Sequence, residues 1–193
     1  MKPVQADWEI EWGGDAPIID ACWPGLVNLR ADPDRVAEIV EADELPGLAR
    51  TLMQLNRTDR LFWTTKCDVW TLLEFDPDEL DAPRVSATDG IACYIDLLPA
   101  APLLWREPAD ALPWCRELCR SLGASPLRAC RADLIIRSAH TGSGHDAVGV
   151  TVYLSACGSS PSQAKTHLEA ALAVFADSVA PAEAPANAAA KLQ

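Results

Sequence analysis

Apolar and polar residues alternate in several short stretches of the chain. In residues 8–12, tryptophan and isoleucine alternate with glutamate, and two glycines separate this stretch from a second apolar run at residues 17–23. A period of two residues is typical of a strand with one buried face, and paired glycines favour a turn. The sequence therefore predicts a β-hairpin over residues 8–23.

Two further pairs of strands are indicated later in the chain. Residues 60–75 are rich in aromatic and β-branched side chains, and residues 91–98 form another apolar run after an acidic stretch. Residues 127–137 and 147–154 flank a Thr-Gly-Ser-Gly turn, and the second of them alternates regularly. Because such residues fit a pleated, half-buried surface, each pair is predicted to form two adjacent strands.

Helical spacing of apolar residues follows each pair of strands. Helices are predicted over residues 33–55, with one interruption, over 108–122 and over 161–179. Asp32 and Ser160 each precede a proline, which is the arrangement of an N-cap followed by proline at the first helical position. The order of elements is thus strand, strand and helix, three times over.

This order predicts an α+β fold. We expect an antiparallel sheet with the helices packed on one face, a two-layer sandwich made of three ββα-like units. Residues 1–180 are expected to form a single domain. Residues 181–193 are rich in alanine and proline and have little to bury, so they are expected to form a flexible tail.

The same alternation assigns the strand side chains to two faces. The apolar face is predicted to carry Trp63, Thr65, Cys67, Val69, Cys93, Ile95, Cys130, Leu134, Val150 and Val152. The opposite face is predicted to carry Thr64, Lys66, Asp68, Trp70, Tyr94, Asp96, Arg131, Asp133, Arg137 and Tyr153. One face is therefore core, and the other mixes charges with aromatic rings.

Composition narrows the class of protein. The net charge of −12 disfavours nonspecific binding to nucleic acid. The charge is unevenly placed, because residues 1–97 hold 20 acidic against 8 basic residues while residues 98–193 hold 8 of each.

No apolar stretch is long enough to cross a bilayer, so no membrane partner is expected. The first residues lack a secretory signal, and the seven cysteines have no CxxC pair. These features predict a cytoplasmic protein with reduced thiols.

Two special roles for cysteine remain as alternatives to plain core packing. Cys115 and Cys119 are four residues apart on one helix and would need Cys130 or a histidine to complete a zinc site, but the usual zinc spacing is absent. Cys67 follows a lysine, which could activate a catalytic thiol. However, Lys66 should point to the opposite face of its strand, so the core interpretation is favoured for all four thiols.

No other motif specifies chemistry. His140, His145 and Asp146 flank the predicted hairpin turn and could meet around a metal, but a solvated turn of this composition needs no function. The acidic residues at 74–81 lack the spacing of a calcium loop. We therefore expect no cofactor and no metal, and no catalytic residue can be named.

The polar face supports two hypotheses about function. The first is a non-catalytic intracellular interaction protein that binds another protein, or a second copy of itself, through the candidate residues Lys66, Asp68, Trp70, Tyr94, Asp96, Arg131 and Arg137. The alternative is a small-molecule-binding protein or enzyme with a pocket between this face and residues 76–89. Its candidate groups are Lys66, Asp68, Asp96 and Arg131, since opposite charges in a cleft can tune an acid or base.

Overall fold

A computed structural model of the chain describes residues 5–10, 18–82, 87–101, 104–142 and 146–179. These residues form a six-stranded sheet in the order β1-β5-β6-β4-β3, with β2 also paired to β5. The strands are β1 (Gln5–Ile10), β2 (Ile19–Asp20), β3 (Phe62–Leu72), β4 (Asp89–Pro99), β5 (Cys130–His140) and β6 (Asp146–Gly158). The helices are the 3₁₀ helix η1 (Pro33–Glu38), α1 (Val40–Glu44), α2 (Pro46–Leu55), α3 (Pro108–Gly123) and α4 (Pro161–Ser178). The predicted tail at 181–193 lies outside the described residues.

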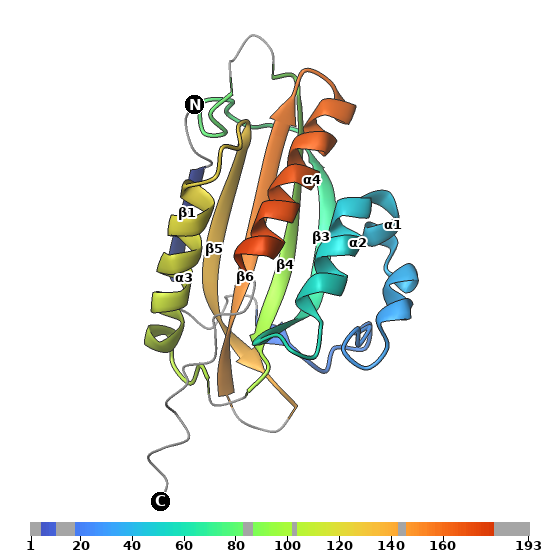
Figure 1. Ribbon diagram of the computed structural model, residues 1–193, viewed down its shortest axis with the longest axis vertical. Helices are drawn as coiled ribbons and strands as arrows, with labels where there is room; N and C mark the ends of the chain where they lie inside the picture. The colour runs from blue at the N-terminus through green and yellow to red at the C-terminus, as the bar shows by residue number, and fades with distance from the viewer. Residues whose placement is uncertain (1–4, 11–17, 83–86, 102–103, 143–145, 180–193) are drawn as a thin grey trace, which may run out of the picture.

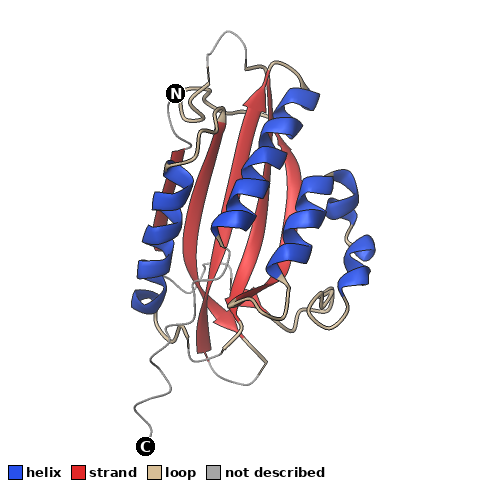
Figure 2. Cartoon of the chain, in the orientation of Figure 1, coloured by secondary structure: helices blue, strands red, loops and turns tan. Residues whose placement is uncertain are grey.

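The α+β class is confirmed. Helices α2, α3 and α4 lie side by side on one face of the sheet (Figure 1, Figure 2). Local signals start two of the helices as expected: Asp32 accepts a hydrogen bond from the backbone of Asp34, and the Ser160 side chain accepts one from Gln163. The opposite side of the sheet, which carries Trp70 among others, is called the open face below.

The sheet is mixed, so the prediction of a purely antiparallel sheet is wrong. Strands β3, β4, β6 and β5 pair antiparallel in that order, but β1 and β2 both run parallel to β5. The hairpin predicted over residues 8–23 is also wrong. β1 pairs with Arg131–Ile136 and β2 with Ala139–His140, so the chain continues in one direction along the same edge. Alternation identifies a strand, but it does not identify the strand's partner.

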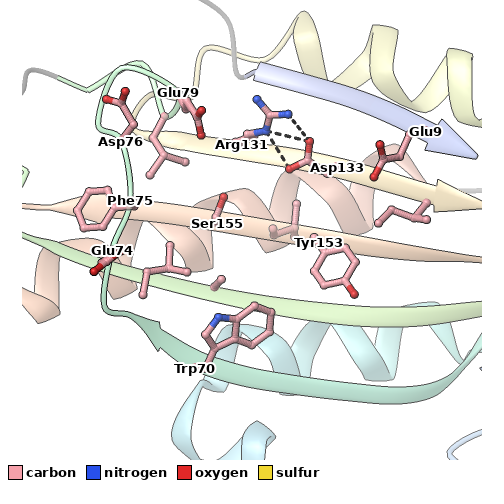
Figure 3. A pocket seen from close by; sticks show the side chains of 15 residues that line it. Glu9, Trp70, Glu74, Phe75, Asp76, Glu79, Arg131, Asp133, Tyr153 and Ser155 are labelled. Carbon is pink, nitrogen blue, oxygen red and sulfur yellow. Dashed lines mark hydrogen bonds and ion pairs between the residues drawn. The ribbon is translucent and has the colours of Figure 1, made fainter. Parts of the chain in front are cut away.

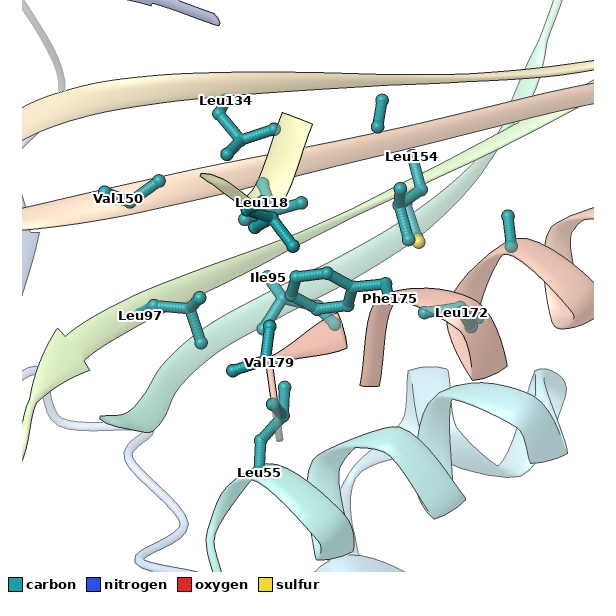
Figure 4. Close-up of a cluster of buried hydrophobic side chains, with 14 of the residues drawn as sticks. Leu55, Ile95, Leu97, Leu118, Leu134, Val150, Leu154, Leu172, Phe175 and Val179 are labelled. Atoms are coloured by element: carbon teal, nitrogen blue, oxygen red, sulfur yellow. The ribbon is translucent and has the colours of Figure 1, made fainter. Parts of the chain in front are cut away.

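The main core lies between the helices and the sheet (Figure 4). The apolar stripe predicted for the last helix is fully buried, from Ala164 through Leu168, Ala171, Leu172 and Phe175 to Val179. The side chains of β4, β5 and β6 that the alternation assigns to the apolar face pack against this stripe. Ile95, Leu134 and Val152 are completely buried. Burial of this contiguous apolar surface is the main stabilising contribution to the fold.

A β-bulge in β3 changes the predicted faces of that strand. Thr64 is opposite Leu97 and Cys67 is opposite Ile95, so β3 advances three residues while β4 advances two. One extra residue reverses the phase of every side chain before it. Cys67 and Val69 pack against the main core as predicted. The residues before the bulge, Trp63 and Thr64, lie on the faces opposite to those predicted.

Trp63 and Thr64 accordingly exchange their predicted faces. Trp63 is paired with Leu98 and packs on the open face, which corrects its assignment to the core face with Cys67. Thr64 points to the helix side, where its hydroxyl accepts a hydrogen bond from Asn56 Nδ2 at 2.6 Å and its backbone amide donates to Asn56 Oδ1 at 3.1 Å. Single-strand alternation could not anticipate an inserted residue.

Two small apolar clusters cover the ends of the open face. At one end, Trp63 packs against a cluster of Ile19, Ala21, Leu98, Ala139 and Ala147. At the other end, Phe75 and Ala87 pack against Leu80, Ala82, Ala129 and Cys157. Ala129 comes just before the first residue of β5 and Ala139 is near its last, so the two clusters lie at opposite ends of this strand. The segment 18–23 and the segment 73–82, called the crossing segment below, thus frame the middle of the open face.

Candidate functional site

Three aromatic side chains are in contact at the centre of the open face. Trp70, Tyr94 and Tyr153 come from the neighbouring strands β3, β4 and β6, and Tyr94 is directly opposite Tyr153. The ring centroids are 6.3 Å apart for Trp70 and Tyr94, 6.4 Å for Trp70 and Tyr153, and 5.8 Å for the two tyrosines. Trp70 remains 36% exposed. The trio offers a rigid aromatic surface with polar hydroxyl groups.

A buried polar network adjoins the aromatic trio. Thr151 donates a hydrogen bond from its hydroxyl to Asp96 Oδ1 at 2.6 Å and accepts one from Arg137 Nε at 3.0 Å. Arg137 Nη2 also donates to the Tyr153 hydroxyl at 3.3 Å. Asp96 is 7% exposed and Arg137 5% exposed, so both charges are held inside the protein by these contacts. The candidate residue Arg137 therefore holds the hydroxyl of Tyr153, and Asp96 is linked to Arg137 through Thr151.

Burial raises the pKa of Asp96 in this network and of Tyr94 in the adjoining aromatic trio. It raises the pKa of Asp96 above its usual range, against the hydrogen bond from Thr151 and the positive charges of Lys66 and Arg137. Burial also raises the pKa of Tyr94 to about 12, and the neighbouring carboxylate of Asp96 adds to the effect. Tyr94 is thus a neutral hydrogen-bonding group at physiological pH.

Two candidate residues lie at the β3 side of the face. Lys66 sits in the bulge, where its ammonium is 5.3 Å from the centre of the Trp23 ring, within the range of a cation–π contact. Trp23 in turn donates from Nε1 to the Thr65 carbonyl at 3.0 Å. Asp68 is exposed, and its carboxylate accepts a hydrogen bond from the backbone of Val69 at 2.7 Å. The structure places Asp68 opposite Tyr94 in the sheet.

Arg131 forms an ion pair with its neighbour on the same side of β5. Its Nε donates to both carboxylate oxygens of Asp133, at 2.8 and 2.9 Å, and its Nη2 is 2.6 Å from Asp133 Oδ1. Both side chains are about one-third exposed, at 33% and 34%. This pair forms one wall of the larger hollow described next (Figure 3).

Two hollows lie on the open face and share Tyr153 as a common wall. The larger, with a volume of about 590 Å³, lies between the sheet and the crossing segment, and its lining includes Trp70, Phe75, Glu79, Arg131 and Tyr153 (Figure 3). The smaller, of about 260 Å³, is lined by Ile18, Ile19, Lys66, Tyr94, Asp96, Arg137, Thr151 and Tyr153. Together they form an elongated recess along the framed part of the face.

The groups named for the enzyme hypothesis are divided between these hollows. Of Lys66, Asp68, Asp96 and Arg131, only Arg131 lines the larger hollow, while Lys66 and Asp96 line the smaller one. Arg131 is paired with Asp133, and Asp96 is hydrogen-bonded to Thr151. The four groups are therefore not assembled around one reacting centre.

Six of the seven cysteines belong to or pack against the apolar clusters, and the seventh, Cys22, is exposed. Cys93, Cys115, Cys130 and Cys157 are buried, and none of the seven is in a disulfide. Burial raises the pKa of Cys67, Cys115 and Cys130 to about 12, which favours the unreactive thiol over the nucleophilic thiolate. No group of three or more His, Cys, Asp or Glu residues within the described ranges is arranged to hold a metal ion. His145 lies outside those ranges.

Sequence reasoning misses one of the two segments that frame the site, residues 18–23, while the other overlaps residues 76–89, which the alternative hypothesis sets beside the polar face. Alternation assigns Ile18 and Ile19 to a hairpin, but they line the smaller hollow, and Glu9 reaches the larger hollow from β1. The sequence signal for the crossing segment is the pair Phe75 and Leu80, which are apolar residues in an otherwise acidic stretch and must be buried somewhere.

Comparison with known proteins gives no family. No protein-family model matches the sequence, and neither a curated protein nor a solved structure is significantly similar to it. Within the described residues, none of the helices has the length and apolar character that crossing a membrane requires.

Proposed function

We propose that the protein is a non-catalytic interaction protein of the cytoplasm that binds a partner protein through the open face. The observation that carries the proposal is the aromatic trio of Trp70, Tyr94 and Tyr153. These rings are held together on the side of the sheet away from the main core, and Trp70 retains exposed surface. Tryptophan and tyrosine contribute disproportionately to binding energy at protein interfaces.

The buried network supports the same function. Arg137, which is itself held by Thr151, donates to the Tyr153 hydroxyl, so little side-chain entropy of Tyr153 would be lost when a partner binds. The cytoplasmic location rests on the seven thiols, four of them buried and none in a disulfide, which suit a reducing compartment.

Affinity capture with matched variants tests this proposal. The wild-type protein, Trp70→Ala and Met53→Ala would each be immobilised and exposed to native lysate at equal concentration. Met53 is the control because it is 45% exposed on α2, on the helix side of the sheet, and does not line either hollow. We expect the wild type and Met53→Ala to retain the same proteins and Trp70→Ala to lose them while remaining folded. Equal retention by all three would refute the proposal.

The size of the larger hollow favours a second candidate function. A volume of about 590 Å³ falls within the range of small-molecule sites, so the same recess could hold a metabolite. Mass spectrometry of the small molecules released by denaturing purified protein distinguishes the two functions. A compound present in stoichiometric amount with the wild type and absent from Trp70→Ala would favour the ligand-binding alternative.

A further inference from the structure

The larger hollow has a strong excess of negative charge. Its lining includes five carboxylates, from Glu9, Glu74, Asp76, Glu79 and Asp133, and one guanidinium, from Arg131. That guanidinium is already paired with Asp133. Within the described part of the chain, Glu9, Glu74 and Glu79 form no ion pair, so their charges are not neutralised locally.

The carboxylates are distributed around the aromatic surface. Glu74, Asp76 and Glu79 belong to the crossing segment, whereas Glu9 comes from the edge strand β1 (Figure 3). Tyr153 lies on the central strand β6, and Trp70 lies on β3, across the hollow from Glu9 (Figure 3). Folding thus gathers acidic residues from distant parts of the acidic first half of the chain at one recess.

Aromatic rings and carboxylates in one recess favour the same kind of group. A guanidinium or ammonium is attracted to the face of a tryptophan or tyrosine ring and to carboxylates, and its aliphatic stem can cover the ring. A phosphate or a carboxylate would be repelled by the unneutralised charges and would gain nothing from the rings. Resting on the proposed function, we infer that the partner docks a basic segment, with an arginine or lysine side chain seated between Trp70, Tyr153 and the crossing segment.

A random heptapeptide library displayed on phage tests the chemistry of this segment even while the partner is unidentified. The library is selected on wild-type protein after depletion on Trp70→Ala, so that only peptides that need the aromatic surface are recovered. A cation–π contact and one unscreened carboxylate should together favour a basic residue by about fivefold over a neutral one at the selected position. We expect arginine and lysine to be enriched by about that factor.

Charge-neutralising variants test whether the carboxylates of the hollow cause the enrichment of basic residues. Glu74→Gln with Glu79→Gln changes two exposed side chains of the hollow, and should reduce the enrichment of basic residues from about fivefold to about twofold, which is the share of the cation–π contact. The matched control is Asp43→Asn with Glu44→Gln, which removes two exposed carboxylates from α1 on the helix side and should leave the enrichment unchanged.

The outcomes separate the two proposals. Enrichment of acidic or purely apolar peptides, or basic enrichment that is undiminished in the Glu74→Gln, Glu79→Gln variant, would overturn the docking of a basic side chain at this hollow while leaving the open face as a binding surface. No enrichment that depends on Trp70 would overturn both.

Discussion

Replacing Thr151 by valine removes one hydroxyl from the centre of the polar network while preserving the shape of the side chain. Thr151 is 2% exposed, and its hydroxyl links Asp96 Oδ1 to Arg137 Nε. After the substitution, a buried carboxylate loses a donor and a buried guanidinium loses an acceptor. Neither group can form a replacement hydrogen bond to bulk water, because Asp96 and Arg137 are almost completely buried.

The expected loss of stability is large for a change of one atom. A hydrogen bond to a charged group contributes about 1.5–3 kcal/mol, so losing two such bonds sets an upper range of roughly 3–6 kcal/mol. Valine is favourable in a strand and the charges retain part of their mutual attraction, which offsets some of this. We therefore expect the free energy of unfolding to fall by about 3 kcal/mol.

Urea denaturation followed by circular dichroism measures this difference. Thr166→Val is the matched control, because the Thr166 hydroxyl donates to the Ser162 carbonyl at 2.9 Å on the exposed side of α4. That variant should change the free energy of unfolding by less than about 0.5 kcal/mol. If Thr151→Val is as stable as the control, the network does not contribute as argued, and Tyr153 is not held in place by it.

Further predictions concern the other parts of the fold. Trp63→Ala should lower the free energy of unfolding by about 3 kcal/mol through loss of packing in its apolar cluster, whereas Leu73→Ala should lie within about 0.5 kcal/mol of wild type in the same urea titration. Thiol titration without reductant should modify the exposed Cys22 first and the four buried cysteines only after denaturation; rapid labelling of a buried thiol in the native protein would contradict the core assignment. Burial raises the pKa of Asp96, so its contribution to stability is greatest below the unfolded-state pKa and is lost as the pH rises through the raised folded-state pKa. Asp96→Asn should therefore gain stability relative to wild type across that pH window, and a pH-independent difference would argue against a perturbed carboxyl.

Local patterns in the sequence are sufficient to predict the helices and the central strands. The period of the last helix locates Phe175 and Leu168 in the core, and the caps at Asp32 and Ser160 mark helix starts. These features depend on residues close together in the chain, where periodicity and capping determine the outcome.

Features that depend on distant residues cannot be obtained in this way. The parallel pairing of β1 and β2 with β5 joins segments more than a hundred residues apart, and the bulge before Cys67 depends on how β3 meets β4. The hydroxyl of Thr151 gains its role only because Asp96 and Arg137 lie on neighbouring strands. Alternation places these side chains on one face, but strand order decides which of them touch.

The most direct test of the binding surface is photocrosslinking from the position of Trp70. An aromatic photocrosslinker, p-benzoylphenylalanine, would replace Trp70 in one variant and Met53 in another, since Met53 is 45% exposed on α2 at the helix side of the sheet. Irradiation of cells that produce each variant, followed by capture of the protein, reveals covalent adducts by their higher mass. We expect a discrete adduct with a partner protein from position 70 and none from position 53. An adduct from position 53 alone, or no adduct from position 70, would contradict it.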